Sequence, residues 1–202
     1  MGEPRIAPGT AADIGRVNFA IARVIGKATG GGPPNVFTTL ARNRRIFRKW
    51  LRFAGALMPG GSLPRAEAEL LILRVAHNTG SDYEWQQHER IAQAEGLSAE
   101  EVARVREGAA AEGWSPRQAL LLRACDELHS DRRIGEDTWN GLRPLLKDHE
   151  LIELCMLVGH YEMLAMTLNS LQVALDELPD SPPPQFMRRL QKIVRGRRAA
   201  HG

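Results

Sequence analysis

The sequence has few features of a β-rich, secreted or membrane-spanning protein. No run alternates β-branched and polar residues between turn signals, which is the pattern of a half-buried strand. No charge-free apolar run approaches the roughly 18–20 residues of a membrane span. The N-terminal stretch MGEPRIAPGTAADIGRV lacks the basic, apolar and small-residue regions of a secretory signal. We therefore expect a cytoplasmic protein that does not bind membranes.

Cysteine is also scarce, which limits the chemistry that the chain can perform. Cys125 and Cys155 lie far apart in apolar segments with helical periodicity. Two cysteines at this spacing fit neither a disulfide framework nor a pair of metal ligands. We expect both to be buried side chains that behave as small apolar groups.

Composition and charge indicate one globular domain rather than a nucleic-acid-binding module. The chain has 202 residues, of which 43% are hydrophobic and 25% charged, and this length suits one domain with tails. The net charge of +3 comes from two local clusters, at 42–49 and 188–198. The cluster at 188–198 is not interleaved with aromatic residues and belongs to no recognised nucleic-acid-binding module, so we expect no nucleic-acid partner.

Helix signals dominate the chain and predict an all-α fold. Ser-x-x-Glu/Gln capping boxes occur at 81–84, 98–101 and 115–118. The segments 70–76 and 151–171 are apolar on most faces, which is typical of central helices. The pattern predicts helices over 12–27, 36–57, 64–78, 82–95, 99–112, 116–130, 136–146, 149–176 and 184–196.

Proline and glycine divide the chain into three parts. The stretches GGGPPN and LPDSPPP cannot continue a helix. We therefore expect an N-terminal arm over 1–35, a compact domain over 36–177, and a Pro-rich linker with a basic C-terminal helix over 178–202.

The stretch SDYEWQQH, residues 81–88, has two interpretations. In the first, Ser81 caps a helix, and Glu84 at the third helical position reaches back to the Ser81 backbone N–H. Tyr83 and Trp85 are then core aromatics, and His88 is a surface residue. In the second, Glu84 and His88, one turn apart on the same helix face, are the acid and base of a catalytic site.

A longer stretch resembles a known family. The run LPRAEAELLILRVAHNTGSDYEWQQHERIAQAEGLS, residues 63–98, is similar to the signature of the carboxymuconolactone decarboxylase family, which includes the alkyl hydroperoxidase D-like proteins. The resemblance extends over about 36–171. It implies the helical alkyl hydroperoxidase D-like fold and a homo-oligomer, commonly a trimer or a hexamer.

The hydroperoxidase branch of that family is built around Cys-x-x-Cys-x-x-x-His, with a glutamate about a dozen residues upstream. Aligned by the histidine, this sequence has Ser81, Glu84 and His88, with Glu69 upstream. Disulfide exchange requires an attacking and a resolving thiol. The departure from the motif therefore disfavours a peroxidase or thiol oxidoreductase, which remains an alternative function.

The decarboxylase branch implies a different reaction, which suits the residues present. It implies a cofactor-free lyase of aromatic catabolism, acting by proton transfer on a small unsaturated carboxylic acid or lactone. His88 would donate or shuttle the proton. Glu84 or Glu69 would orient and charge the imidazole, and Tyr83 would donate a hydrogen bond to the oxyanion.

Several neighbouring residues are candidates for substrate binding, and for each a purely structural role stays open. The candidates are Arg74, Trp85, Ser81 and His77. Arg42, Arg44 and Arg45 lie in a helix that the family places near the pocket mouth, and each guanidinium suits a substrate carboxylate.

The remaining histidines favour structural readings. We expect His160 to be a core or interface histidine and His129 to complement a helix dipole. A cation held by Glu84, His88 and His160 has no support from a metal-binding motif, so we expect neither a metal nor a cofactor. A non-catalytic scaffold or ligand-binding protein is the third functional hypothesis.

Overall fold

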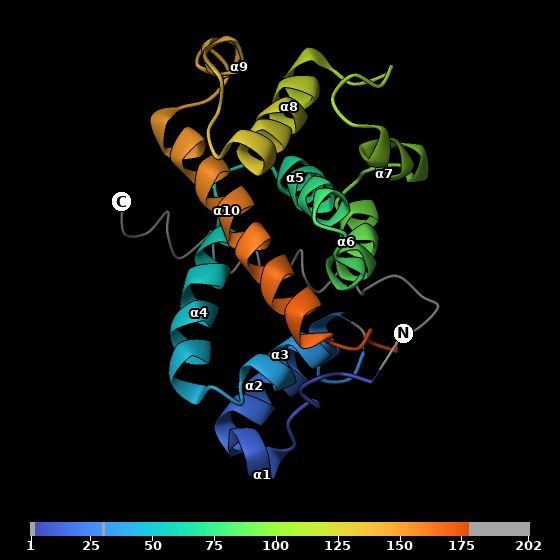
Figure 1. Ribbon diagram of the computed structural model, residues 1–202, viewed down its shortest axis with the longest axis vertical. Coiled ribbons are helices and arrows are strands. Elements are labelled where there is room, and N and C mark those ends of the chain that lie inside the picture. The colour runs from blue at the N-terminus through green and yellow to red at the C-terminus, as the bar shows by residue number, and fades with distance from the viewer. Residues whose placement is uncertain (1–2, 30, 178–202) are drawn as a thin grey trace. The chain divides into compact units, whose positions relative to one another are not determined.

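A computed structural model describes residues 3–29 and 31–177, and all regular elements in these ranges are helices (Figure 1). The prediction of an all-α fold is confirmed. The expected linker and basic helix within 178–202 lie outside the described residues.

The helices follow one another with short connections. In chain order they are α1 (Ala11–Ile14), α2 (Arg16–Thr29), α3 (Asn35–Leu40), α4 (Arg44–Leu57), α5 (Arg65–Asn78), α6 (Asp82–Ala94), α7 (Ala99–Arg104), the 3-10 helix η1 (Val105–Glu107), α8 (Pro116–Asp131), α9 (Glu136–Leu142) and α10 (Asp148–Leu171).

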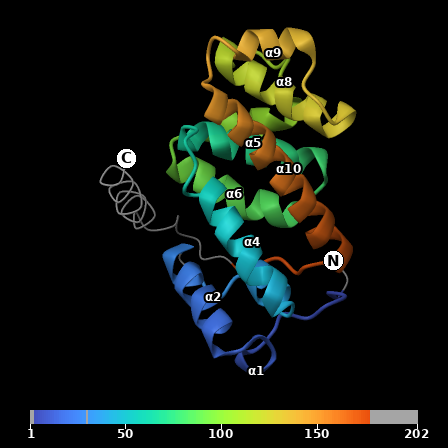
Figure 2. The same ribbon diagram turned by 90° about the vertical axis from the view of Figure 1, so that its left-hand side faces the viewer.

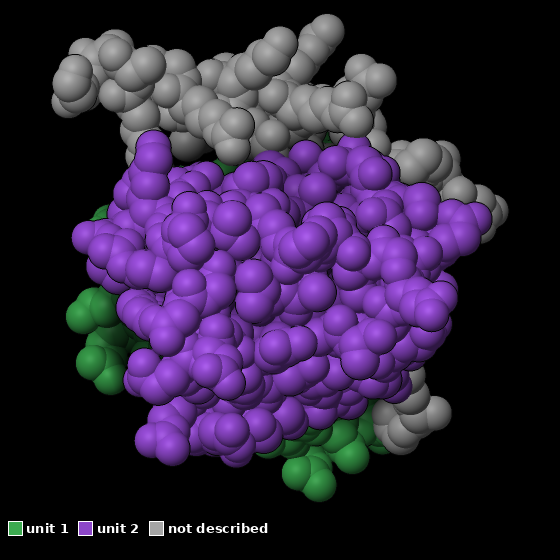
Figure 3. All heavy atoms as spheres, turned by 90° about the horizontal axis from the view of Figure 1, so that it is seen from above, with its two compact units in different colours: residues 1–60, 168–202 green, residues 61–167 purple. Residues whose placement is uncertain are grey.

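The chain forms two compact units, coloured separately in Figure 3. The first comprises Met1–Gly60 and Leu168–Gly202, and the second comprises Gly61–Thr167. In the first unit, Ile14, Ala41 and Phe47 form a small buried cluster. The three-part division expected from proline and glycine stays a prediction.

The second unit is built around α5. Figures 1 and 2 show α5 beside α6 and α8, and residues of these helices are in contact. A buried apolar cluster joins α5 to its neighbours through Leu70, Leu73, Ala92, Leu97, Val102, Val105 and Leu122. The expected central position of 70–76 is therefore confirmed.

Several expected helices are interrupted by local backbone preferences. Gly15 has φ 85° and separates α1 from α2, a conformation that glycine adopts without steric cost. The Asn43 side chain accepts a hydrogen bond from the Ile46 N–H and starts α4 anew within the expected helix 36–57. Gly108, with φ 87°, ends the segment expected to run to 112.

Two of the three expected capping boxes are present, and the third is not. Ser98 and Ser115 form capping boxes with Glu101 and Gln118. Ser81 is the N-cap residue of α6, but its backbone N–H donates to the Ala76 carbonyl at 2.8 Å. The expected capping role of Glu84 is therefore wrong, because the turn that leaves α5 already uses the Ser81 N–H.

The helix α10 is the longest in the described chain. Among the described residues it alone is long and apolar enough to cross a membrane, judged by length and composition, and 56% of its most apolar window is buried inside the protein. Core helices of soluble proteins meet the same criteria, so this is weak support for a membrane span.

Candidate active site

Glu84 is the most unusual polar residue of the second unit. Its side chain points into the interior from the first turn of α6, and the residue is 2% exposed. Neither carboxyl oxygen has a hydrogen-bond partner among the described residues. Buried carboxylates are normally paired, because an isolated charge is costly to remove from water.

Burial changes the protonation of Glu84. Loss of water is the main cause that raises its pKa to about 8, and the charge of Glu162 adds to the rise. The nearby Ser81 hydroxyl lowers the pKa of Glu84, although it does not meet the geometry of a hydrogen bond. Glu84 is therefore mostly a neutral carboxylic acid at pH 7.

His88 lies one turn after Glu84 and is held by a second buried acid. Its Nδ1 is 2.7 Å from Oε2 of Glu69, which is fully buried on α5. The other Glu69 oxygen accepts from Arg65 Nη2 at 3.1 Å. With Nδ1–H donating to Glu69, Nε2 is the ring nitrogen left for proton exchange.

Two aromatic rings of α10, those of Tyr161 and His160, lie beside His88 and Glu69. The Tyr161 ring meets the His88 ring edge to face at a centroid distance of 5.1 Å, and it meets the His160 ring at the same distance. Burial, followed by the charges of Glu69 and Glu84, raises the pKa of Tyr161 well above its usual value. Burial, with a contribution from His88, lowers the pKa of His160 to about 4. Both side chains are neutral at pH 7.

A second histidine–carboxylate pair lies at the edge of this unit. Nδ1 of His129, on α8, is 2.7 Å from Oε1 of Glu162, on α10. The His129 side chain is 35% exposed, whereas that of Glu162 is 10% exposed. The sequence prediction that His129 only complements a helix dipole missed this carboxylate partner.

The structure brings together three of the four predicted catalytic residues. Glu69, Glu84 and His88 belong to one buried cluster. Tyr83 is buried on α6, and its expected contact with an oxyanion stays a prediction. Sequence reasoning missed Arg65 and Tyr161. Arg65 was detectable as a cation one helical turn before Glu69, whereas nothing local identified Tyr161.

The predicted substrate-binding residues are placed differently. Ser81 is buried beside Glu84. Trp85 packs on the apolar cluster of the second unit, and the Arg106 guanidinium lies 3.7 Å from its ring centre. Arg74 pairs with Asp126 at 2.6 Å and also donates to the carbonyls of η1. A structural role therefore accounts for Trp85 and Arg74.

His77 is exposed near the end of α5.

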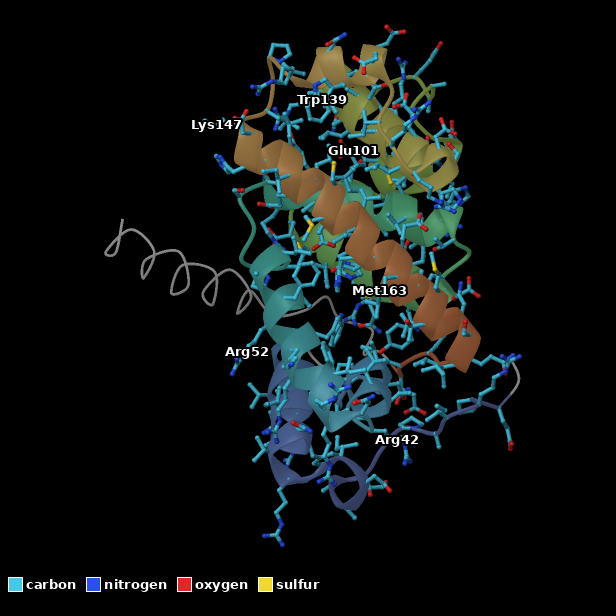
Figure 4. The ribbon with its side chains drawn as sticks, turned by 60° about the vertical axis from the view of Figure 1, so that its left-hand side comes forward. Arg42, Arg52, Glu101, Trp139, Lys147 and Met163 are labelled. Carbon is cyan, nitrogen blue, oxygen red and sulfur yellow. The ribbon has the colours of Figure 1, made fainter. Side chains whose placement is uncertain are left out.

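The arginines considered as substrate clamps lie in the first unit. Arg42 donates to the Ala7 carbonyl, and Arg44 donates to the Asp13 carbonyl at 2.8 Å. An open hollow of about 430 Å³ is lined by Arg44, Arg45, Arg48, Lys49 and Arg52, all on α4. Figure 4 labels Arg42 and Arg52.

Neither cysteine has the environment of a reactive thiol. Cys125 is fully buried, and this burial raises its pKa far above the usual value. Partial burial also raises the pKa of Cys155. Thiol chemistry proceeds through the thiolate, which both environments disfavour. Within 3–29 and 31–177, no three histidine, cysteine or acidic side chains are grouped so as to hold a metal ion.

The comparisons with known proteins agree with the fold. Residues 44–127 match the model of the carboxymuconolactone decarboxylase family. This range includes Glu69, Glu84 and His88. No match is found among curated proteins.

Solved structures extend the similarity to most of the chain. An alkylhydroperoxidase AhpD core protein, described as an uncharacterized peroxidase-related protein from Ralstonia eutropha, has a TM-score of 0.78 at 18% identity over 88% of this chain and 94% of its own. A peroxidase-related protein from Silicibacter sp. has a TM-score of 0.75 at 15% identity, with 92% and 99% covered.

A third similar structure is that of an enzyme with a different described activity. The debrominase Bmp8 has a TM-score of 0.72 at 11% identity, with 94% of this chain and 97% of its own covered. A cysteine-to-alanine variant of that enzyme has been solved with 2,3,4-tribromopyrrole. At these identities the structures show a shared fold, so the chain has the alkyl hydroperoxidase D-like helical fold, and its residues 44–127 are similar to the carboxymuconolactone decarboxylase family.

Proposed function

We propose that the chain is a cofactor-free lyase that acts by proton transfer on a small unsaturated carboxylic acid or lactone. The observation that carries this proposal is Glu84, a buried, neutral carboxylic acid without a hydrogen-bond partner among the described residues, one helical turn from His88. Strongly shifted, unpaired acids in protein interiors are uncommon outside functional sites. The loss of the capping explanation for Glu84 supports a chemical role.

The second support is the way in which His88 is held. Glu69 accepts from Nδ1 at 2.7 Å, and Arg65 holds the other Glu69 oxygen. This arrangement fixes the ring orientation and directs proton exchange to Nε2. Between the two glutamates that the sequence suggested as partners of His88, the hydrogen bond favours Glu69 as the orienting group. Glu84 then acts separately, as an acid.

These roles suit decarboxylation of an unsaturated carboxylated lactone. The bond to the carboxylate carbon breaks and CO2 leaves, while the electron pair of that bond moves through the conjugated system to the lactone carbonyl oxygen. Neutral Glu84 donates a hydrogen bond to this oxygen and does not repel an anionic substrate. Protonated His88 then delivers a proton to carbon, and solvent returns a proton to the ring. Aromatic catabolism is the metabolic setting that we propose.

Peroxidase chemistry has less support. The similar structures include peroxidase-related proteins, but Ser81 and Glu84 stand where the hydroperoxidase motif has its cysteine pair. The raised pKa values of Cys125 and Cys155 disfavour the thiolates that such a reaction needs.

The direct experiment measures CO2 release by the purified full-length chain from a panel of unsaturated carboxylated lactones. We expect turnover in the wild type and a decrease of about 10²–10⁴-fold in His88→Ala, as for a lost acid–base group. His149→Ala removes an exposed histidine at the start of α10 and serves as the matched control. Full activity of His88→Ala, or binding of these lactones without turnover, would contradict the proposal.

A further inference from the structure

The exposed face of α10 is apolar between residues 152 and 166. Its exposed positions between 152 and 166 are Ile152, Met156, Gly159, Met163 and Met166, and none of them is charged. They recur at intervals of four, three, four and three residues. This spacing places them on one narrow stripe, as at the seam of two packed helices. Figure 4 labels Met163 on this helix.

The exposed large apolar residues of the second unit are concentrated between residues 139 and 166. Its large hydrophobic side chains with substantial exposure are Trp139, Leu145, Ile152, Met156, Met163 and Met166. The residues from 61 to 138 contribute none to this set. Localised apolar surface of this kind marks an interface, whereas scattered apolar residues do not.

Gly159 adds an independent observation at the centre of the stripe. It lies in the interior of a 24-residue helix, where glycine reduces helix stability relative to alanine. A Cβ built at this position would meet no atom of the described residues within 4 Å, so residues 3–29 and 31–177 give no steric reason for glycine. Close approach of another helix backbone is a sufficient reason.

The stripe is nearly symmetric about Gly159. Ile152 and Met166 lie seven residues before and after it, and Met156 and Met163 lie three before and four after. A surface of this kind complements itself when a second copy is related to it by a two-fold axis at the glycine. We infer that α10 is the dimer seam of this protein, where two copies pack α10 antiparallel with their Gly159 residues at the crossing point.

Charge favours the antiparallel direction. Asp148 and Glu150 lie in the first turn of α10. Asp148 is paired with Arg143 at 2.6 Å, so the helix dipoles, which oppose each other in antiparallel packing, carry this preference. Each partner in a stable complex buries about 800 Å². The stripe is roughly 20 Å long, and Trp139 and Leu145, just before α10, enlarge the apolar surface.

This inference does not depend on the proposed reaction, and it refines the expected oligomer. A hexamer built from two-fold dimers contains such a seam, whereas an isolated cyclic trimer does not. The seam therefore predicts an assembly with an even number of chains, of which the dimer is the smallest.

The first test measures the molar mass of the full-length chain by light scattering at micromolar concentration. We expect the wild type to have an even multiple of the 22.4 kDa chain mass. Met163→Glu, which places two charges in the seam, should reduce the mass of this species by half or more. Val24→Glu changes an apolar residue on α2 that is 66% exposed, and it should leave the mass unchanged. A monomeric wild type, including one that is recovered only with membranes, would overturn the inference.

The second test determines the direction of packing by cysteine cross-linking in a Cys155→Ser background. Oxidation of a mixture of Ile152→Cys and Met166→Cys chains should give cross-linked dimers, and each chain alone should give few. Gly159→Cys alone should cross-link to itself. Efficient linkage of Ile152→Cys to itself, without linkage in the mixture, would exclude the antiparallel seam.

Discussion

At the scale of single residues, Glu84 links structure to function. A carboxyl group that is 2% exposed and has no partner among the described residues lowers the stability of the folded state whenever it ionises. Such a cost is retained in proteins where the group has a task. In this site the task that we propose is to remain a neutral acid beside His88.

The raised pKa of Glu84 predicts how stability depends on pH. The folded state binds this proton more tightly than the unfolded state, so the contribution of Glu84 to stability decreases as pH rises from 4.5 toward about 8. Glu84→Gln should therefore gain stability relative to wild type over this window, by at most about 4–5 kcal/mol. Urea denaturation at pH 5 and pH 8.5 measures the effect. An equal stability difference at the two pH values would refute it.

His160 predicts the opposite behaviour on the acidic side. Its pKa is lowered to about 4, so the unfolded state binds more protons than the folded state between pH 6.5 and 4. Stability from neutral His160 is present above pH 6.5 and decreases as pH falls through this window. His160→Phe should reduce this acid sensitivity by at most about 3 kcal/mol, measured by thermal unfolding across the window. Identical acid profiles for the two proteins would count against this role of His160.

Part of this site was predicted correctly from the sequence. The capping role considered for Glu84 was wrong. The family resemblance left Glu84 and Glu69 as alternative partners of His88, and the structure places Glu69 Oε2 2.7 Å from His88 Nδ1. The spacing of Ser81 and Glu84 fits both a helix cap and an inward-facing acid. Only the path of the preceding turn decides between them, and a local pattern does not contain that path. Tyr161 lies more than 70 residues after His88, so the tertiary fold alone reveals the contact.

At the scale of helices, the local sequence predicted where helices begin better than where they are interrupted. The capping boxes at Ser98 and Ser115 were predicted correctly because both partners lie within one turn. The breaks at Gly15 and Asn43 were missed, because isolated glycine and asparagine residues also occur inside helices.

The two kinds of N-cap predict different costs of mutation. Ser98→Ala removes a side-chain hydrogen bond to the Glu101 N–H and should lower stability by about 0.5–2 kcal/mol. Ser81→Ala removes no capping hydrogen bond, because the Ser81 side chain makes none at α6. Chemical denaturation of both variants tests this contrast. A larger capping loss for Ser81→Ala at pH 5, where Glu84 is neutral, would show that α6 is capped differently.

At the scale of the whole molecule, the fold does not determine the class of reaction. The same helical fold occurs in peroxidase-related proteins and in a debrominase, so the architecture alone does not select a chemistry. The residues of the site make that selection. By the resemblance of the sequence to the hydroperoxidase motif, Glu84 lies where that motif has a cysteine, and the two cysteines of this chain are buried or half-buried.

This difference predicts that activity is insensitive to thiol reagents. Alkylation of the native protein should leave Cys125 unmodified, because that residue is fully buried. It should also leave lactone turnover unchanged, since no step of the proposed reaction uses a thiol. Mass spectrometry of the treated protein, combined with the CO2 assay, checks both points. Loss of turnover in step with modification would restore the peroxidase alternative.

The most direct test of the account is the titration of the Glu84 carboxyl group. Carbon-13 NMR of the full-length chain labelled at glutamate carboxyl carbons reports each midpoint, and the signal of Glu84 is assigned by its absence in Glu84→Gln. The account predicts a midpoint of about 8, with a neutral acid at pH 7. A midpoint near the ordinary value of 4.5 would mean that Glu84 is ionised at neutral pH, and would contradict its role as the acid of the site.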